Sequence, residues 1–388
     1  MPPFTSNDFF LSIRLAPFYA ALFLIVGLQL PFWPVWLSFK GLSAEEIGIV
    51  LSAPVWSKIL FTPMITSLAD YFGRRRAPLV IMSALSLALF QLYFVVDGFL
   101  QIFAVALSIG ILISSFSAVG DNLVLTLGRT RNIDYPRIRL WGSISFIGGS
   151  FFGGLLLAER TPDFIPVMLS AAFLLLFLCC LLLPEVHISP SEQGKKGLRR
   201  LLKSPPFLVF LLAAGLIQGS HAILYAAGTL HWQKQGISDA TIGFLWAEGV
   251  IVEIILFAFA KHLFKSFSPL QLIVLGGISG MIRWTVMGLS PDVPVLIFIQ
   301  MLHGVTFAAA HLGAMRFITE KIPVEMSARA QGLYSAISLG LIMGGGLFFS
   351  GYLYESFSVG AYFFMAGSCA MALLICQYLR RAPESLQL

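Results

Sequence analysis

The stretch Ser43-Ala44-Glu45-Glu46-Ile47-Gly48 recurs as Ser238-Asp239-Ala240-Thr241-Ile242-Gly243, at an offset of 195 positions. Each copy follows one long apolar segment and opens the next. In the first copy, Ser43 and Glu46 have the spacing of a capping box, which starts a helix, and Ser238 stands at the same place in the second. The repeat predicts a duplicated membrane protein. Related halves of this kind place a solute-binding site between them, near the middle of the bilayer.

The composition excludes an ordinary soluble protein. Of the 388 residues, 57% are hydrophobic and 11% are charged, whereas soluble domains have roughly 25% charged residues. The apolar runs of about 20 residues are long enough to cross a hydrocarbon core of about 30 Å. We expect an all-α membrane protein with about twelve transmembrane helices in two pseudo-symmetric six-helix bundles. The expected spans are 15–38, 44–68, 77–96, 99–127, 138–158, 163–183, 206–229, 238–262, 269–288, 292–317, 327–350 and 357–379.

One long polar stretch divides the chain. It includes a basic cluster from Lys195 to Lys203 and is typical of a flexible cytoplasmic linker. The expected organisation is an N-terminal bundle over residues 1–186, a linker over 187–204 and a C-terminal bundle over 205–388.

The loop charges predict the orientation. Counted alternately, one set of loops contains seventeen Lys and Arg residues, and the other contains only Lys40, Arg160 and Lys234. Because cations are retained on the cytoplasmic side, both termini should be cytoplasmic. The basic net charge is therefore a topology signal, and we expect no nucleic-acid partner.

Several function classes have no support in the sequence. The histidines and cysteines show no metal-ligand spacing, and no phosphate-binding loop or nucleophile elbow is present. We therefore expect no metal, no cofactor, no ATP-driven pump and no enzyme activity. The first apolar segment has no small-residue cleavage site, so we expect it to be a retained span.

Ionisable side chains inside the spans are the best functional candidates, because burying one in hydrocarbon costs at least about 2.5 kcal/mol. Lys58 lies in the middle of the second span, and the offset of 195 places Glu253 at the matching position of the eighth. The same structural position thus carries a cation in one half and an anion in the other. One interpretation is a division of labour, with an anionic substrate at Lys58 and a proton at Glu253. The alternative is a structural ion pair across the interface of the two bundles.

The second half contains further candidates for proton coupling. Glu248 and Glu253 are about 140° apart around a helix, so only one of them can face a cavity squarely; the symmetry with Lys58 favours Glu253. His303 and His311 lie in the tenth span, and together with Arg283 they suggest a proton relay. The alternatives are interhelical hydrogen bonds for the histidines and snorkelling to the headgroups for Arg283.

The loop after the second span, Ser67-Leu68-Ala69-Asp70-Tyr71-Phe72-Gly73-Arg74-Arg75-Arg76, resembles the signature loop of the major facilitator superfamily. That resemblance implies a gating latch made by Asp70, Gly73, Arg74, Arg75 and Arg76. Thr66 stands where the family motif starts with glycine, and the copy near Lys261 is degenerate.

Four further stretches look like the phenylpropionate permease family of that superfamily and are also similar to lactose permease and the oligosaccharide–proton symporters. They are Leu30 to Leu37, Arg137 to Ser143, Gln218 to His221, and Leu302 to Gly304. By resemblance, Asp121 and Arg139 match a substrate-binding acid and arginine, Arg283 and His303 match a proton-coupling pair, and Glu248 or Glu253 matches an eighth-helix glutamate.

Two departures decide between these relatives. Thr306 stands where lactose permease has an acid, and Lys58 has no counterpart there but looks like the basic residue of phenylpropionate permeases. Because Lys58 and Arg139 can jointly hold a carboxylate, they favour an anionic substrate. The hypothesis is a bacterial inner-membrane symporter that imports a small aromatic carboxylate with protons and functions as a monomer. The alternatives are a sugar or nucleoside symporter, or a membrane-embedded sensor.

Overall fold

The computed structural model describes residues 6–131, 133–185 and 196–381. Within these ranges, eleven helices are long and apolar enough to cross a membrane. The last runs for 55 residues from Met326 to Arg380, about 80 Å as a single helix, far more than the hydrocarbon core of about 30 Å. It is interrupted at Ser358, where φ is 51° and a 3-10 turn begins. Two crossings therefore lie in this segment, which confirms the all-α fold with about twelve spans.

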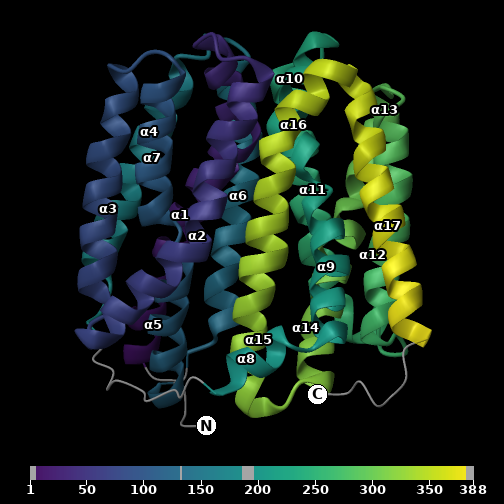
Figure 1. Cartoon of the computed structure of the whole chain (residues 1–388). Helices are drawn as coiled ribbons and strands as arrows, with labels where there is room; N and C mark the ends of the chain where they lie inside the picture. Colours follow the sequence, from purple (N-terminus) through teal and green to yellow (C-terminus); the bar gives the residue numbers. More distant parts are fainter. Residues whose placement is uncertain (1–5, 132, 186–195, 382–388) are drawn as a thin grey trace. The chain divides into compact units, whose positions relative to one another are not determined.

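The chain divides into two compact units. Unit 1 comprises residues 1–42, 56–192 and 238–247. Within it, α1 packs against α6 and α7, and α3 packs against α7 (Figure 1). Its helices are α1 (Ser6–Phe39), the later part of α2 (Ala44–Tyr71), α3 (Arg76–Phe90), η1 (Gln91–Phe94), α4 (Phe99–Ile113), α5 (Phe116–Thr130), α6 (Tyr135–Leu157), α7 (Phe164–Leu182) and the first part of α11 (Asp239–Leu263).

Unit 2 comprises residues 43–55, 193–237 and 248–388. Helix α12 packs against α14 and α17, and α9 packs against α17 and η4. Besides parts of α2 and α11, it contains α8 (Lys196–Leu202), α9 (Pro205–Gly219), η2 (Leu224–Gly228), α10 (Thr229–Lys234), α12 (Pro269–Met287), α13 (Val293–Met301), η3 (Gly304–Ala309), α14 (Ala310–Lys321), α15 (Val324–Ala336), η4 (Ile337–Ile342), α16 (Met343–Phe357), η5 (Ser358–Gly360) and α17 (Ala361–Arg381).

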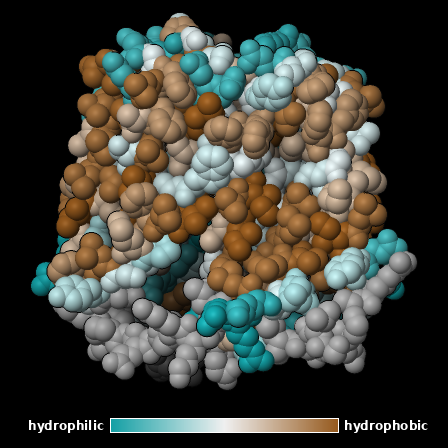
Figure 2. All heavy atoms as spheres, in the orientation of Figure 1, coloured by the Kyte–Doolittle hydropathy of each residue, from teal (hydrophilic) through white to brown (hydrophobic). Residues whose placement is uncertain are grey.

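The surface exposes apolar side chains in the way that a lipid environment requires. Large apolar side chains are exposed along the spans, for example Phe152 at 61% and Phe298 at 72%. On the visible face, hydrophobic residues cover the middle and hydrophilic residues gather toward the margins (Figure 2). Such exposure would be an aggregation hazard in water and is expected in hydrocarbon.

The repeated stretch starts a helix in both copies. The backbone N–H of Ser43 donates to the Glu46 carboxylate at 2.9 Å, and the N–H of Glu46 donates to the Ser43 hydroxyl at 3.2 Å. In the second copy, the N–H of Thr241 donates to the Ser238 hydroxyl at 3.3 Å. These contacts confirm the predicted capping box and its partial copy.

The linker expected at 187–204 is partly helical. Residues 187–195 lie outside the described part of the chain. The segment Lys196–Leu202 forms α8, and Leu201 is fully buried in the hydrophobic core that contains Phe207 and Phe210. The prediction of a flexible chain is therefore wrong for this segment, because Leu201 anchors it.

Glycines allow very close helix crossings at corresponding places in the two copies. In unit 2, a Cβ at Gly48 would lie 2.7 Å from the carbonyl oxygen of Leu347, and one at Gly351 would lie 2.5 Å from the Cα of Glu45. In unit 1, a Cβ at Gly243 would lie 3.2 Å from the Cα of Gly154. Backbones can approach this closely only where side chains are absent.

A methyl group at the first crossing should be costly. We expect Gly351→Ala to lower the melting temperature of the purified protein, because overpacking against backbone costs roughly 1–3 kcal/mol. Gly345→Ala in the same helix is the matched control, since a Cβ there meets nothing within 4 Å. Equal melting temperatures for both variants in detergent would contradict the close crossing.

Candidate functional site

Arg283 of α12 is the centre of a buried polar network in unit 2. Its side chain is fully buried, and its guanidinium lies 4.4 Å from the Trp284 ring centroid. Nη1 donates to Nδ1 of His303 at 3.2 Å and to the Thr306 hydroxyl at 3.1 Å, and Nη2 donates to Oε1 of Gln300 at 2.8 Å. These contacts exclude the snorkelling interpretation for Arg283.

The hydrogen bond to Arg283 fixes the tautomer of His303. Arginine can only donate, so Nδ1 of His303 must accept, and the proton of the neutral ring lies on Nε2. This Nε2 is 3.8 Å from Oε2 of Glu253 in α11. The structure therefore aligns Arg283, His303 and Glu253, three of the residues that the sequence predicted, in one connected row.

His221 also belongs to this network, although its sequence position did not lead us to predict it as a site residue. Its Nδ1 lies 3.0 Å from the carbonyl oxygen of Gln218, which can only accept, so the proton lies on Nδ1 and Nε2 accepts from the Thr306 hydroxyl at 3.3 Å. The ring of His221 meets that of His303 edge-on at 5.3 Å. Its position in the middle of an apolar span was the signal that could have found it.

Glu248 and His311, the other two proton-coupling candidates, are not members of the row formed by Arg283, His303 and Glu253. Glu248 is 8% exposed, and its Oε2 has no hydrogen-bond partner in the described part of the chain. His311 forms a hydrogen bond with the Tyr334 hydroxyl at 3.1 Å. It is linked to His303 only by ring stacking through Phe307. Glu253, rather than Glu248, is the carboxylate beside the histidine.

In unit 1, the predicted substrate-binding acid and arginine flank one tyrosine. The hydroxyl of Tyr19 in α1 donates to Oδ1 of Asp121 in α5 at 2.6 Å. The guanidinium carbon of Arg139 in α6 lies 5.6 Å from the Tyr19 ring centroid and 3.8 Å from that of Phe23. In the described part of the chain, Asp121 and Arg139 form no ion pair with each other.

Lys58 lies in the part of α2 that belongs to unit 1. Its side chain has accessible surface area, and it has neither a hydrogen-bond nor an ion-pair partner within the described ranges.

The predicted gating loop links three helices of unit 1. Arg75 is 3% exposed, and it donates to Oδ1 of Asn122 at 2.7 Å and to the carbonyl oxygen of Ala69 at 2.6 Å. Arg76 donates to the carbonyl oxygen of Leu181 at 2.6 Å. Gly73 has a positive φ of 62° and makes the turn between α2 and α3, whereas Arg74 is exposed. The side chain of Asp70 lies outside the described part of the structure.

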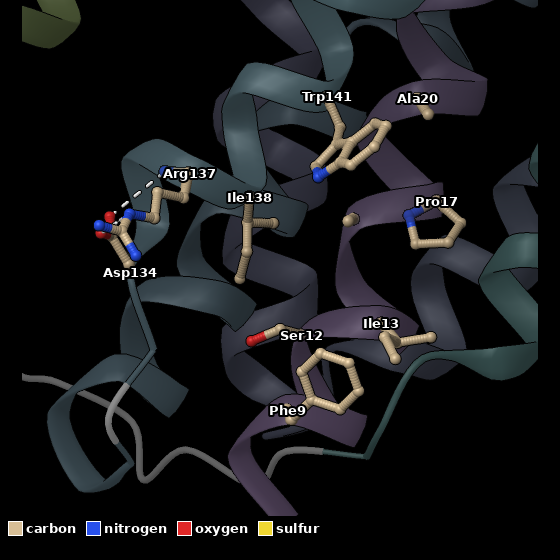
Figure 3. A pocket seen from close by; sticks show the side chains of 10 residues that line it. Phe9, Ser12, Ile13, Pro17, Ala20, Asp134, Arg137, Ile138 and Trp141 are labelled. Atoms are coloured by element: carbon tan, nitrogen blue, oxygen red, sulfur yellow. Dashed lines mark hydrogen bonds and ion pairs between the residues drawn. The ribbon is translucent and has the colours of Figure 1, made fainter. Parts of the chain in front are cut away.

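A groove of about 560 Å³ lies elsewhere in unit 1, between the first turns of α1 and α6 (Figure 3). Its lining is mainly apolar, and the exposed pair formed by Arg137 and Asp134 at 3.0 Å lies at its edge. The lining residues do not include Lys58, Asp121 or Arg139, so this groove is distinct from the charged site. They are Phe9, Ser12, Ile13, Ala16, Pro17, Ala20, Asp134, Arg137, Ile138 and Trp141.

Residues 12–365 match the sequence model of the MFS_1 like family. The chain belongs to this family. Like other MFS_1 like proteins, it is a membrane transporter and not an enzyme, and it is a multi-pass protein of the inner membrane. The resemblance to the major facilitator superfamily is thereby confirmed.

The relatives of this MFS_1 like protein are named as transporters of different solutes. The chain is 30% identical to the probable 3-phenylpropionic acid transporter of Escherichia coli (strain K12), over 90% of this chain and 92% of the relative. It is 25% identical to the maltose permease of Geobacillus stearothermophilus, over 95% of each. The crystal structure of the nucleoside transporter NupG matches with a TM-score of 0.83 at 16% identity, covering 96% of this chain and 100% of that one, which shows a shared fold.

The Arg283 network can be tested by a charge-conserving change. We expect Arg283→Lys to destabilise the protein by roughly 2–4 kcal/mol, because an ammonium cannot reach three separate acceptors in the geometry of a guanidinium. The matched control is Arg316→Lys, which alters a partly exposed pair with Glu320 worth at most about 1 kcal/mol. Unfolding in detergent measures both, and equal losses would contradict the network.

Proposed function

We propose that this MFS_1 like transporter imports a small aromatic carboxylate together with protons, by alternating access of its two halves. The observation that supports this most directly is the pair of cations in unit 1, Lys58 and Arg139, that have no carboxylate partner among the described residues. The name of the 30% identical relative from Escherichia coli agrees with this substrate class.

The charge of the site favours a carboxylate over a sugar as the substrate. A cation in a membrane-spanning segment costs several kcal/mol unless it is hydrated or paired. A substrate carboxylate would neutralise one cation and could accept hydrogen bonds from both, whereas an uncharged sugar would leave them unpaired. Phe23, stacked on Arg139 at 3.8 Å, would offer an aromatic surface to the ring of the substrate.

Proton coupling is assigned to unit 2. Glu253 carries and releases the proton, and the adjacent Nε2–H of the neutral His303 ring is a donor that stabilises the ionised carboxylate after release. Arg283 holds His303 in the tautomer that presents a proton to Glu253, and Thr306 connects this pair to His221. In this proposal both termini are cytoplasmic and the monomer is functional.

Sugar and nucleoside relatives support a second candidate, a symporter for an uncharged solute. The maltose permease aligns over 95% of the chain, and the putative nucleoside transporter YegT of Escherichia coli (strain K12) over 78%. Both have lower sequence identity to this chain, 25% and 26%, than the probable 3-phenylpropionic acid transporter has, at 30%. Competition by an uncharged solute separates the two candidates.

The direct test is uptake of labelled 3-phenylpropionate into vesicles that contain the protein, under an acid-outside pH gradient. We expect accumulation that is abolished by a protonophore and not competed by maltose or uridine. Lys58→Gln should raise the KM at least about tenfold, since a charge-assisted contact is worth roughly 1.5–3 kcal/mol. Lys40→Gln, outside the site, is its control. Absence of accumulation, or competition by either uncharged solute, would contradict the proposal.

Glu253→Gln tests the proton assignment separately. The amide cannot bind and release a proton, so we expect loss of gradient-driven accumulation while exchange of labelled for unlabelled substrate continues. The exposed Glu320 provides the control Glu320→Gln. Unchanged accumulation by a well-folded Glu253→Gln protein would remove Glu253 from the coupling mechanism.

A further inference from the structure

We propose that Tyr19 determines selectivity for anions by holding Asp121 away from Arg139. This inference rests on the proposed function for the class of substrate. It adds that Tyr19 keeps Arg139 available to bind the substrate carboxylate. Tyr19 is a positioning residue, because it acts on the substrate through Asp121 and Arg139.

The first observation is the bond between Tyr19 and Asp121. Tyr19 is fully buried, and its hydroxyl donates to Oδ1 of Asp121 at 2.6 Å, a short distance typical of a hydrogen bond to a charged acceptor. The ring of Tyr135 lies edge-on to that of Tyr19 at 6.3 Å, and Tyr135 also interacts by side-chain hydrogen bonds with Asp121 and with Arg139. Tyrosine hydroxyls therefore stabilise the carboxylate of Asp121.

The second observation concerns Arg139. Its guanidinium carbon lies over the Phe23 ring and near Tyr19, and Gly142 leaves the space for it, because a Cβ at Gly142 would lie 2.9 Å from Nη1 of Arg139. Arginine and aspartate favour bidentate pairing wherever they meet. Here both groups touch the same tyrosine from different helices, and yet they form no ion pair within the described ranges.

Charge balance then explains the selectivity. If Asp121 paired with Arg139, the guanidinium donors would be occupied and Lys58 would be the single cation left for the substrate. With Asp121 held by Tyr19, the guanidinium keeps its donors for a carboxylate brought by the substrate. Removing only the Tyr19 hydroxyl should release Asp121 toward Arg139 and place it in competition with that carboxylate.

Four variants in purified full-length protein test this mechanism: Tyr19→Phe, Asp121→Asn, the double variant, and Tyr93→Phe as control. Tyr93 is also a buried tyrosine of unit 1, 3% exposed, in the cluster with Trp33 and Trp36. The first readout is the rate at which phenylglyoxal modifies Arg139, followed by mass spectrometry of its peptide. The second is the KM for 3-phenylpropionate.

We expect Tyr19→Phe to slow modification of Arg139 and to raise the KM by about tenfold, the equivalent of about 1.4 kcal/mol. Tyr93→Phe should change neither. In the Asp121→Asn background the Tyr19→Phe change should have no further effect on either quantity, because no carboxylate remains to compete.

Two results would overturn the proposal. One is wild-type reactivity of Arg139 in Tyr19→Phe. The other is a Tyr19→Phe effect that persists beside Asp121→Asn, which would mean that Tyr19 acts by a contact of its own. If Tyr19→Phe does not fold, Asp121→Asn alone decides, since a fall in Arg139 reactivity in that variant would contradict competition. The modification assay needs no substrate, so it remains informative if 3-phenylpropionate is not transported and the proposed function fails.

Discussion

A charged side chain inside a hydrocarbon layer must be hydrogen-bonded, paired or hydrated, because an uncompensated one costs several kcal/mol. The two units meet this constraint differently. In unit 2, both terminal nitrogens of the Arg283 guanidinium donate to Gln300, His303 and Thr306 in a fully buried network. In unit 1, Arg139 lies over the rings of Phe23 and Tyr19, and no acid in the described part of the chain forms an ion pair with it. Arg283 thus uses both terminal nitrogens on partners within the protein, whereas Arg139 has no carboxylate partner among the described residues. That difference is the physical basis for assigning the proton to one unit and the substrate to the other.

Much of the fold was predictable, because membrane spans depend on length and hydrophobicity alone. The repeated stretch also located the capping box of Ser43 and Glu46 and its partner at Ser238. The sequence did not predict α8, because its anchoring depends on where Leu201 finds a core. Nor did it predict the close crossing of Gly48 with α16, since pairing between distant segments leaves no local pattern. The π-helical segments η2, η3 and η4 were likewise hidden, because a wider turn has no distinct composition.

Less of the site was predictable. Glu253, Arg283 and His303 could be chosen because ionisable residues in apolar spans are expensive, but their contact could not be calculated from a 3.6-residue periodicity. Neutral partners such as Gln300 and Thr306 carry no comparable signal, since such residues often make ordinary interhelical hydrogen bonds. Snorkelling was one alternative for Arg283, and the structure buries its side chain fully. The link from Tyr19 to Asp121 joins residues 102 positions apart and was found only in the folded chain.

The central claim is that unit 1 recognises the charge of its substrate. The most direct measurement is calorimetric titration of the purified protein with 3-phenylpropionate and with its uncharged amide, 3-phenylpropionamide, which is nearly the same size and keeps the phenyl ring. We expect the acid to bind and the amide to bind at least about 100-fold more weakly, a difference of about 2.8 kcal/mol. Equal affinities would contradict the account, because they would show that Lys58 and Arg139 do not act on the carboxylate.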